Sequence, residues 1–228
     1  MPRKKLVRSN VLPYHIYARS NNRDWFYLPT EDLWPIFIDQ LFNVTIAYGL
    51  RVHAFTLMNN HYHLLASTPF ANLGENMNYF NREVSREINR RTNRSNHVFG
   101  GPYKESLIED SNYYFNAFRY VYQNPIRAGL SFTVESYPYS TISVLSGGYA
   151  RAFPLHQSIF DYKSPIMNEP ERALLWLNKL PSAANIEATR LGLQKTTFNA
   201  PIDRNTRSAF EFFSADEKDE LDALLNHK

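Results

Sequence analysis

The 228-residue sequence predicts an α+β fold, in which an antiparallel sheet carries helices on one face. Two observations support this prediction. Short strand-like segments bounded by polar turns are mixed with longer segments whose apolar residues recur at helical spacing. Their order along the chain, with two strands meeting in a tight turn between two helices, is typical of antiparallel rather than parallel sheets.

The first predicted strand covers residues 14–19 and is followed by a polar loop at 20–23. A helix is expected over residues 32–48, where apolar residues follow helical spacing and a glycine comes next. Pro35 favours a start near residue 32 rather than at Thr30, because proline is tolerated only in the first turn of a helix.

Two further strands are expected at about 50–58 and 61–67, joined by a hairpin-like turn at residues 59–60. The next helix should begin after Asn72, which is suited to be its N-cap and has Glu75 three residues on. The apolar stripe of this helix leaves most of its arginines on other faces.

A fourth strand is predicted over residues 103–109 and a helix over 112–123, ended by Asn124-Pro125 because the residue before a proline disfavours helix. The order is therefore β-α-β-β-α-β followed by an extra, tyrosine-bearing helix. This is the ferredoxin-like pattern, an antiparallel sheet with helices on one face.

Beyond about residue 150, prolines separate short helical pieces near 172–180 and 183–193, and Ser214-x-x-Glu217 is the capping box of a last helix. We therefore expect two parts. Residues 1–150 form the main domain, and residues 151–228 form a small helical C-terminal extension that is a candidate for DNA binding.

The composition is that of a globular protein, with 43% hydrophobic and 21% charged residues. No apolar run reaches the 18 or so residues of a membrane helix, and the basic N-terminus lacks the apolar stretch of a signal peptide. We expect a cytoplasmic protein without a membrane partner. The absence of cysteine excludes disulfides, thiolate zinc sites and cysteine nucleophiles.

The net charge of +3 hides a strong asymmetry along the chain. Residues 1–23 carry six basic side chains and no acid, and residues 82–104 carry six against two, whereas residues 211–222 hold six acids and one lysine. Basic clusters with interleaved aromatic residues are typical of proteins that bind a phosphate backbone. Ordinary solvated helix faces would give the same pattern.

Two motifs carry chemistry. In His61-Tyr62-His63, alternate residues of a strand face the same way, so both imidazoles project from one face and provide half of a metal site. Tyr120 and Asn124 lie one turn apart on the predicted helix, and Asn124 is expected at its end with a free amide oxygen. A phenol beside a cation can act as a nucleophile on phosphate. Satisfied histidines and a buried tyrosine remain the alternative.

The order and spacing of these motifs resemble those of the REP-associated tyrosine transposases, single-tyrosine members of the HUH endonuclease superfamily. The resemblance rests on a His-hydrophobe-His strand followed about sixty residues later by Tyr-x-x-x-Asn-Pro-x-Arg-Ala-Gly, and it covers residues 10–148. Further matching segments are Tyr14-His15-Ile16, Arg19, Asn21-Asn22-Arg23, Phe99, Tyr103-Lys104 and Pro138-Tyr139-Ser140. The chain departs from the family at Asn59-Asn60, where many relatives have a proline, and at Pro102, where an arginine is common.

The resemblance implies that His61 and His63 are metal ligands, that Asn124 is the third, and that Tyr120 is the nucleophile. It further implies Mg²⁺ or Mn²⁺ as cofactor and single-stranded or hairpin DNA as substrate, cleaved through a 5′-phosphotyrosine and rejoined by strand transfer. The location expected for such an enzyme is the bacterial cytoplasm, at the nucleoid. The candidates for DNA contact are Arg3, Lys4, Lys5, Arg8, Arg19, Arg23, Arg82, Arg86, Arg90, Arg91, Lys104 and Arg127.

Three other functions account for part of the sequence. A non-catalytic module that binds single-stranded nucleic acid would explain the charge and the aromatic residues. A metal-independent RNA endonuclease would use His61 or His63 as general acid or base. A closed structural zinc site would need four protein ligands. The sequence leaves open whether the protein is a monomer or a homodimer.

Overall fold

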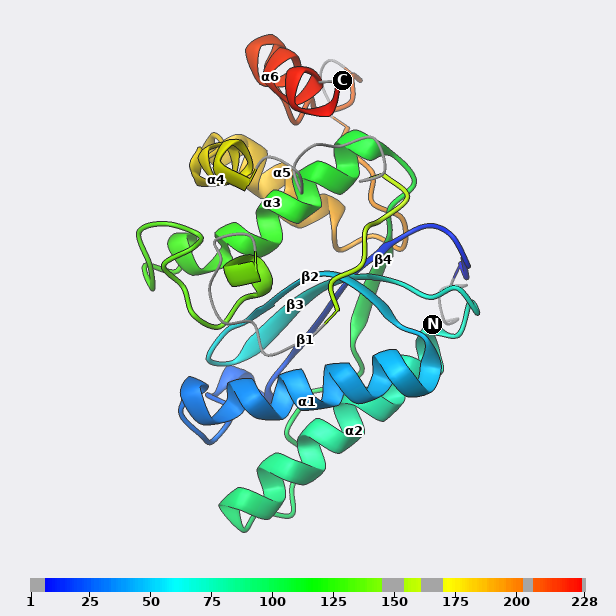
Figure 1. The fold of residues 1–228 in the computed structure, drawn as a ribbon, viewed down its shortest axis with the longest axis vertical. Coiled ribbons are helices and arrows are strands. Elements are labelled where there is room, and N and C mark those ends of the chain that lie inside the picture. Colours follow the sequence, from blue (N-terminus) through cyan, green and yellow to red (C-terminus); the bar gives the residue numbers. More distant parts are fainter. Residues whose placement is uncertain (1–6, 145–153, 161–169, 203–206, 227–228) are drawn as a thin grey trace.

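The computed structural model describes residues 7–144, 154–160, 170–202 and 207–226. A four-stranded sheet lies between two layers of helices, with helices α1 and α2 on one side and helices α3, α4 and α5 on the other (Figure 1). None of the helices described is long and apolar enough to cross a membrane.

The sheet has the predicted ferredoxin-like topology. Its strands are β1 (Tyr14–Arg19), β2 (Arg51–Leu57), β3 (His61–Ser67) and β4 (Lys104–Leu107). They lie in the order β2-β3-β1-β4, and every neighbouring pair is antiparallel. The last strand is shorter than the predicted 103–109, because β4 pairs with β1 only from Tyr14 to Tyr17.

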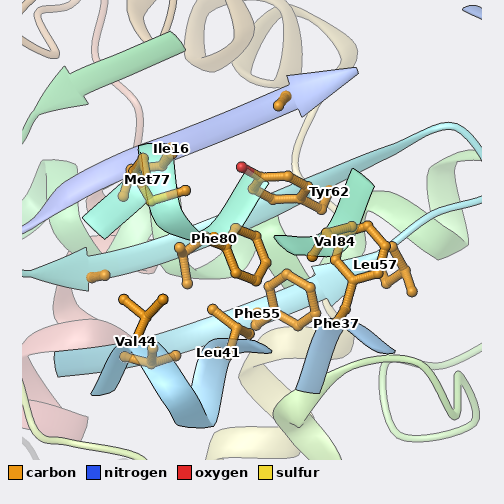
Figure 2. Packing of buried hydrophobic residues seen from close by; sticks show 14 of the residues in the cluster. Ile16, Phe37, Leu41, Val44, Phe55, Leu57, Tyr62, Met77, Phe80 and Val84 are labelled. Carbon is orange, nitrogen blue, oxygen red and sulfur yellow. The ribbon is translucent and has the colours of Figure 1, made fainter. Parts of the chain in front are cut away.

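One face of the sheet is filled by α1 (Thr30–Tyr48) and α2 (Leu73–Thr92), which pack against each other as well as on the strands. Figure 2 shows aromatic rings from the sheet and from these two helices meeting in this core. The ring of Phe80 lies 5.5 Å from that of Tyr62 and 5.9 Å from that of Phe37, both edge to face. Tyr62 is thus a core residue whose hydroxyl bonds Asn81, and the histidines on either side of it must face the other way.

Helix α1 begins at Thr30, so the prediction of a start near Asp32 was wrong. The N–H groups of Asp32 and Leu33 both donate to the carbonyl of Pro29, which closes the first turn two residues earlier than expected. Pro35 removes one helical hydrogen bond inside the helix. The burial of Leu33, Ile36 and other apolar side chains of α1 outweighs that loss.

Helix α2 begins after Asn72, as predicted, but the predicted side-chain cap is absent. Asn72 has φ −104° and ψ 33°, outside the extended conformation that a capping side chain needs. Its amide nitrogen donates instead to the carbonyl of Tyr48 and so joins the start of α2 to the end of α1.

Helix α3 (Ser111–Arg127) lies on the opposite face of the sheet, and its predicted end at residue 123 was wrong. Asp110 caps its start by accepting hydrogen bonds from the N–H groups of Asn112 and Tyr113. The helix continues through Pro125, and the N–H of Ala128 donates to the carbonyl of Asn124, 3.0 Å away. Asn124 therefore lies inside the helix instead of at its end.

The C-terminal extension adds α4 (Pro170–Asn178), α5 (Ala183–Gly192) and α6 (Ala215–Asn226). Its apolar residues, among them Trp176, Phe198 and Phe213, form one core with α3. The predicted capping box is confirmed, because the N–H of Glu217 donates to the Ser214 hydroxyl and the Glu217 carboxylate accepts from the N–H of Ser214.

The extension is also tied to the edge of the sheet. The N–H of Leu107 in β4 donates to the carbonyl of Thr196 at 2.8 Å, and the N–H of Phe198 donates to the carbonyl of Leu107 at 2.7 Å. The division into residues 1–150 and 151–228 stays a prediction, but the described residues of the two parts share hydrogen bonds and a core.

Candidate active site

A row of polar side chains crosses the sheet face that lies under α3. Along β1, His15, Tyr17 and Arg19 alternate with residues that enter the α1–α2 core. The antiparallel register sets Tyr17 opposite His63 and Arg19 opposite His61. The two imidazoles of β3 therefore lie beside the row from β1, with their ring centroids 5.1 Å apart.

Helix α3 places Tyr120 over these histidines. The Tyr120 ring lies 5.5 Å from that of His63 and 6.1 Å from that of His15, edge to face in both cases. The guanidinium of Arg127, two turns further along the helix, lies 4.7 Å from the centroid of the Tyr120 ring. Tyr120 is partly exposed, so its side chain is in reach of a ligand that enters from solvent.

Asn124 lies on the same face of α3 as Tyr120, one turn later. Because the helix continues past it, its amide nitrogen donates to the carbonyl of Tyr120 at 2.7 Å, and the residue is only 9% exposed. No residue in the described part of the chain donates a hydrogen bond to its Oδ1. The amide is therefore held by its nitrogen, which leaves its oxygen available to a ligand.

These side chains line a pocket of about 610 Å³, which is within the range of ligand-binding clefts. Its walls come from the sheet, the loop after β1, α3 and the end of α5. The lining residues are His15, Tyr17, Arg19, Arg23, His61, His63, Lys104, Tyr120, Asn124, Arg127, Arg190, Leu193 and Gln194. Five of them are cationic and none is acidic, so the pocket favours an anionic ligand.

Hydrogen bonds fix the orientation of both imidazoles. Asn60 donates its amide nitrogen to the carbonyl of Arg23, so its oxygen is the atom that lies 2.7 Å from His61 Nδ1. His61 must then carry its proton on Nδ1, which leaves a lone pair on Nε2. His63 Nδ1 lies 2.9 Å from His15 Nε2, and this contact orients the His63 ring, with the donor set by the tautomers of the two histidines. Such outer partners orient the histidines of metal sites.

Burial keeps these imidazoles neutral. It lowers the pKa of His61 to about 4 and that of His15 to about 3, and it also lowers the pKa of His63 well below its usual range. Neutral imidazole is the form that binds metals, and His61, His63 and the Asn124 oxygen together fit a divalent cation. In the described residues, no three His, Asp or Glu side chains are grouped so that they could hold a metal ion.

The predicted DNA-contact residues fall into separate places. Arg19, Arg23, Lys104 and Arg127 line the pocket. Arg8 lies outside it and is ion-paired with Glu105 of β4. Arg3, Lys4 and Lys5 lie outside the described residues.

The arginines of α2 are far from this pocket in the fold, on a helix that covers the other face of the sheet. All four are paired with carboxylates of the same helix: Arg82 and Arg86 with Glu83, and Arg90 and Arg91 with Glu87. Arg82 also lines a second hollow of about 590 Å³, together with residues 95–99 and 101–102.

Five pocket residues were not assigned to the site from the sequence: His15, Tyr17, Arg190, Leu193 and Gln194. His15 and Tyr17 could have been found, since they alternate with apolar residues in the same strand as Arg19. No sequence pattern around Arg190 indicates a position in the site, because its place in the pocket depends on how α5 packs against α3. The geometry thus enlarges the predicted set of four residues to a cationic pocket built from both parts of the chain.

Comparison with known proteins bears on the fold. No family model matches the chain, and no curated protein matches it in sequence. Among solved structures, a REP-associated tyrosine transposase bound to a REP hairpin superposes with a TM-score of 0.52 at 16% identity, covering 70% of this chain and 94% of that chain. A candidate transposase from Deinococcus radiodurans gives a TM-score of 0.36 at 16% identity, over 49% of this chain and 88% of its own.

The first match shows that the chain has the fold of a REP-associated tyrosine transposase, as the sequence motifs predicted. At 16% identity, the property that this match shows to be shared is the fold alone.

Proposed function

We propose that the protein is a metal-dependent endonuclease and strand transferase that acts on single-stranded, hairpin-forming DNA through a covalent tyrosine intermediate. The observation that carries the proposal is the position of Tyr120, edge-on to His63 in a pocket with five cationic side chains and no acidic one. Nucleophile, candidate metal ligands and phosphate-binding charges thus occupy one cavity.

His61, His63 and Asn124 would hold Mg²⁺ or Mn²⁺, which when bound withdraws charge from the scissile phosphate. His15 and Asn60 keep the two imidazoles in place through their Nδ1 atoms. The cationic residues Arg19, Arg23, Lys104 and Arg127 attract and position the phosphate.

The proposed chemical step is an in-line displacement at phosphorus by the hydroxyl of Tyr120. A bond forms between the phenolic oxygen and phosphorus, and the bond from phosphorus to the 3′-oxygen breaks. The phenol loses its proton and the departing 3′-oxygen takes one up, so the products are a 5′-phosphotyrosine and a free 3′-hydroxyl. Attack by another 3′-hydroxyl reverses the step and joins strands without an external energy source.

A flexible, unpaired strand suits this pocket, because only such a backbone can bend so that the attacking and leaving oxygens are in line. The similar structure was solved with a REP hairpin bound, which supports a hairpin as the substrate class proposed for this chain. A DNA substrate also implies the bacterial nucleoid as the place of action.

The RNA endonuclease alternative fits the histidines less well. A general acid or base works best with a pKa near the working pH, whereas burial lowers the pKa of His61 to about 4. A low pKa and an oriented lone pair suit a metal ligand.

The test is a denaturing gel of the protein with labelled hairpin DNA, in Mn²⁺ or in EDTA. We expect a covalent protein–DNA band that needs the metal, disappears in Tyr120→Phe and persists in Tyr122→Phe. Tyr122 is the matched control, since it is a buried tyrosine two residues along the same helix. Tight hairpin binding with no covalent band would indicate a non-catalytic binding module. Cleavage of a labelled RNA in EDTA, measured in a parallel reaction, would indicate the metal-independent RNA endonuclease.

A further inference from the structure

Helix α5 of the C-terminal extension is fixed against α3 in one register. The amide nitrogen of Asn116 in α3 donates to the hydroxyl of Thr189, 2.9 Å away, and both residues are buried. At the end of α5, Gly192 lies so close to the ring of Phe198 that a β-carbon there would clash with it. The neighbour of Thr189 in the sequence, Arg190, is thereby held at the pocket.

Arg190 completes the cationic lining on the side opposite the sheet. It shares the pocket with Tyr120, Tyr17 and Arg127. The phenols of Tyr120 and Tyr17 lie close enough to Arg190 to raise its pKa, although the Glu187 carboxylate is the largest cause. Arg127 lies over the Tyr120 ring, and Arg190 lines the same pocket, so guanidinium groups from α3 and from α5 share this pocket with the tyrosine.

The partner of Arg190 is a carboxylate on its own helix. Glu187 accepts two hydrogen bonds from it, one from Nε at 2.7 Å and one from a terminal guanidinium nitrogen at 2.5 Å. This two-pronged geometry is also the one in which arginine binds a phosphate. The Arg190 and Glu187 side chains are 45% and 52% exposed, and an ion pair so exposed to solvent is weak and easily exchanged.

We propose that Arg190 is a catalytic residue supplied by the C-terminal extension, which releases Glu187 when DNA enters and grips the non-bridging oxygens of the scissile phosphate beside Tyr120. This inference rests on the proposed function, since it assigns a role within the same reaction. The Glu187 carboxylate then acts as a stand-in for the phosphate while the pocket holds no DNA.

The test measures single-turnover formation of the covalent adduct at saturating hairpin DNA. Arg190→Ala should slow it by about 10²-fold, the usual effect of removing one donor to a developing anionic charge. Arg190→Lys should recover part of the rate, because lysine keeps the positive charge but cannot bind two phosphate oxygens at once as a guanidinium does. Arg207→Ala, which removes an exposed arginine of the extension away from the pocket, should stay within about twofold of the wild type.

Two further experiments distinguish a direct contact between Arg190 and the phosphate from an indirect effect of the substitution on the structure. Glu187→Gln should leave the rate at or above that of the wild type, because the phosphate no longer competes with a carboxylate. A methylphosphonate at the scissile position removes one anionic oxygen from the phosphate. If Arg190 contacts that oxygen, Arg190→Ala should slow adduct formation less on this substrate than on normal DNA, because two changes that remove the same interaction are not additive.

The inference is overturned if Arg190→Ala forms the adduct as fast as Arg207→Ala, if Glu187→Gln is as slow as Arg190→Ala, or if the methylphosphonate penalty is unchanged. In each of these cases the wild-type adduct still forms and the proposed function stands. If the wild type forms no adduct at all, the proposed function fails and the role of Arg190 fails with it.

Discussion

At the scale of single residues, the histidine pair from neighbouring strands gives the most specific expectation. His15 bonds His63 Nδ1 and so fixes its ring. We predict that His15→Ala weakens divalent metal binding by about 10- to 100-fold, the usual effect of losing an outer partner of a metal ligand. Calorimetric titration with Mn²⁺ in a Tyr120→Phe background measures this without interference from catalysis.

His53→Ala is the matched control for that experiment. His53 is equally buried, but it bonds Ser67 and the carbonyl of His156 on another part of the sheet. Its removal should leave Mn²⁺ affinity unchanged. Equal Mn²⁺ affinities in the Tyr120→Phe parent and in its His15→Ala and His53→Ala variants would show that His15 does not support the metal site.

Buried neutral histidines also make folding pH-dependent. The pKa values of His15, His53 and His61 fall from 6.5 to about 3, 4 and 4, so between those values and 6.5 the unfolded chain binds more protons than the folded one. The free energy of unfolding should be at its full value above about pH 6.5 and fall by several kcal/mol as the pH drops toward 4. Urea unfolding at pH 7 and pH 5 measures it. A flat profile would contradict neutral burial.

At the scale of elements, the strands and the hairpin turn were predictable, because period-2 alternation and turn residues are local signals. The two wrong helix boundaries on α1 and α3 lie near prolines. Pro35 and Pro125 both sit inside helices that run past the expected boundary. A proline inside a helix removes one backbone hydrogen bond and so lowers the stability of the helix. On α1 and α3, the stability gained by burying apolar side chains is larger than this loss.

The start of α6 gives a test of local capping. Ser214 and Glu217 satisfy each other's backbone N–H groups. We predict that Ser214→Ala lowers the free energy of unfolding by about 1 kcal/mol, the usual effect of losing an N-cap. Ser95→Ala, in an exposed loop, should change it by less than about 0.5 kcal/mol. Equal unfolding curves for the two variants would argue against the cap.

At the scale of the whole molecule, the C-terminal extension and α3 share one core, in which Trp176 is 1% exposed. Trp176→Ala should lower the free energy of unfolding by about 3–5 kcal/mol. Leu175→Ala is the control, because its side chain is 73% exposed on the same helix and should have little effect. Equal effects of the two variants would mean that the extension is not packed on α3.

The same shared core explains what the sequence could not predict about the site. His61 and His63 followed from strand alternation, and Tyr120 and Asn124 from helical spacing, all within short segments. Arg190 comes from the other part of the chain. Its position depends on long-range packing of α5 against α3 through Asn116 and Thr189, and such packing leaves no local pattern in the sequence.

The most direct measurement identifies the residue that becomes attached to DNA. The wild-type protein is incubated with hairpin DNA and Mn²⁺, digested with nuclease and trypsin, and its peptides are sequenced by mass spectrometry. We expect a 5′-linked nucleotide on Tyr120, in the peptide that runs from Tyr120 to Arg127. A nucleotide on Tyr122, on Tyr17 or on any residue outside the pocket would contradict Tyr120 as the nucleophile.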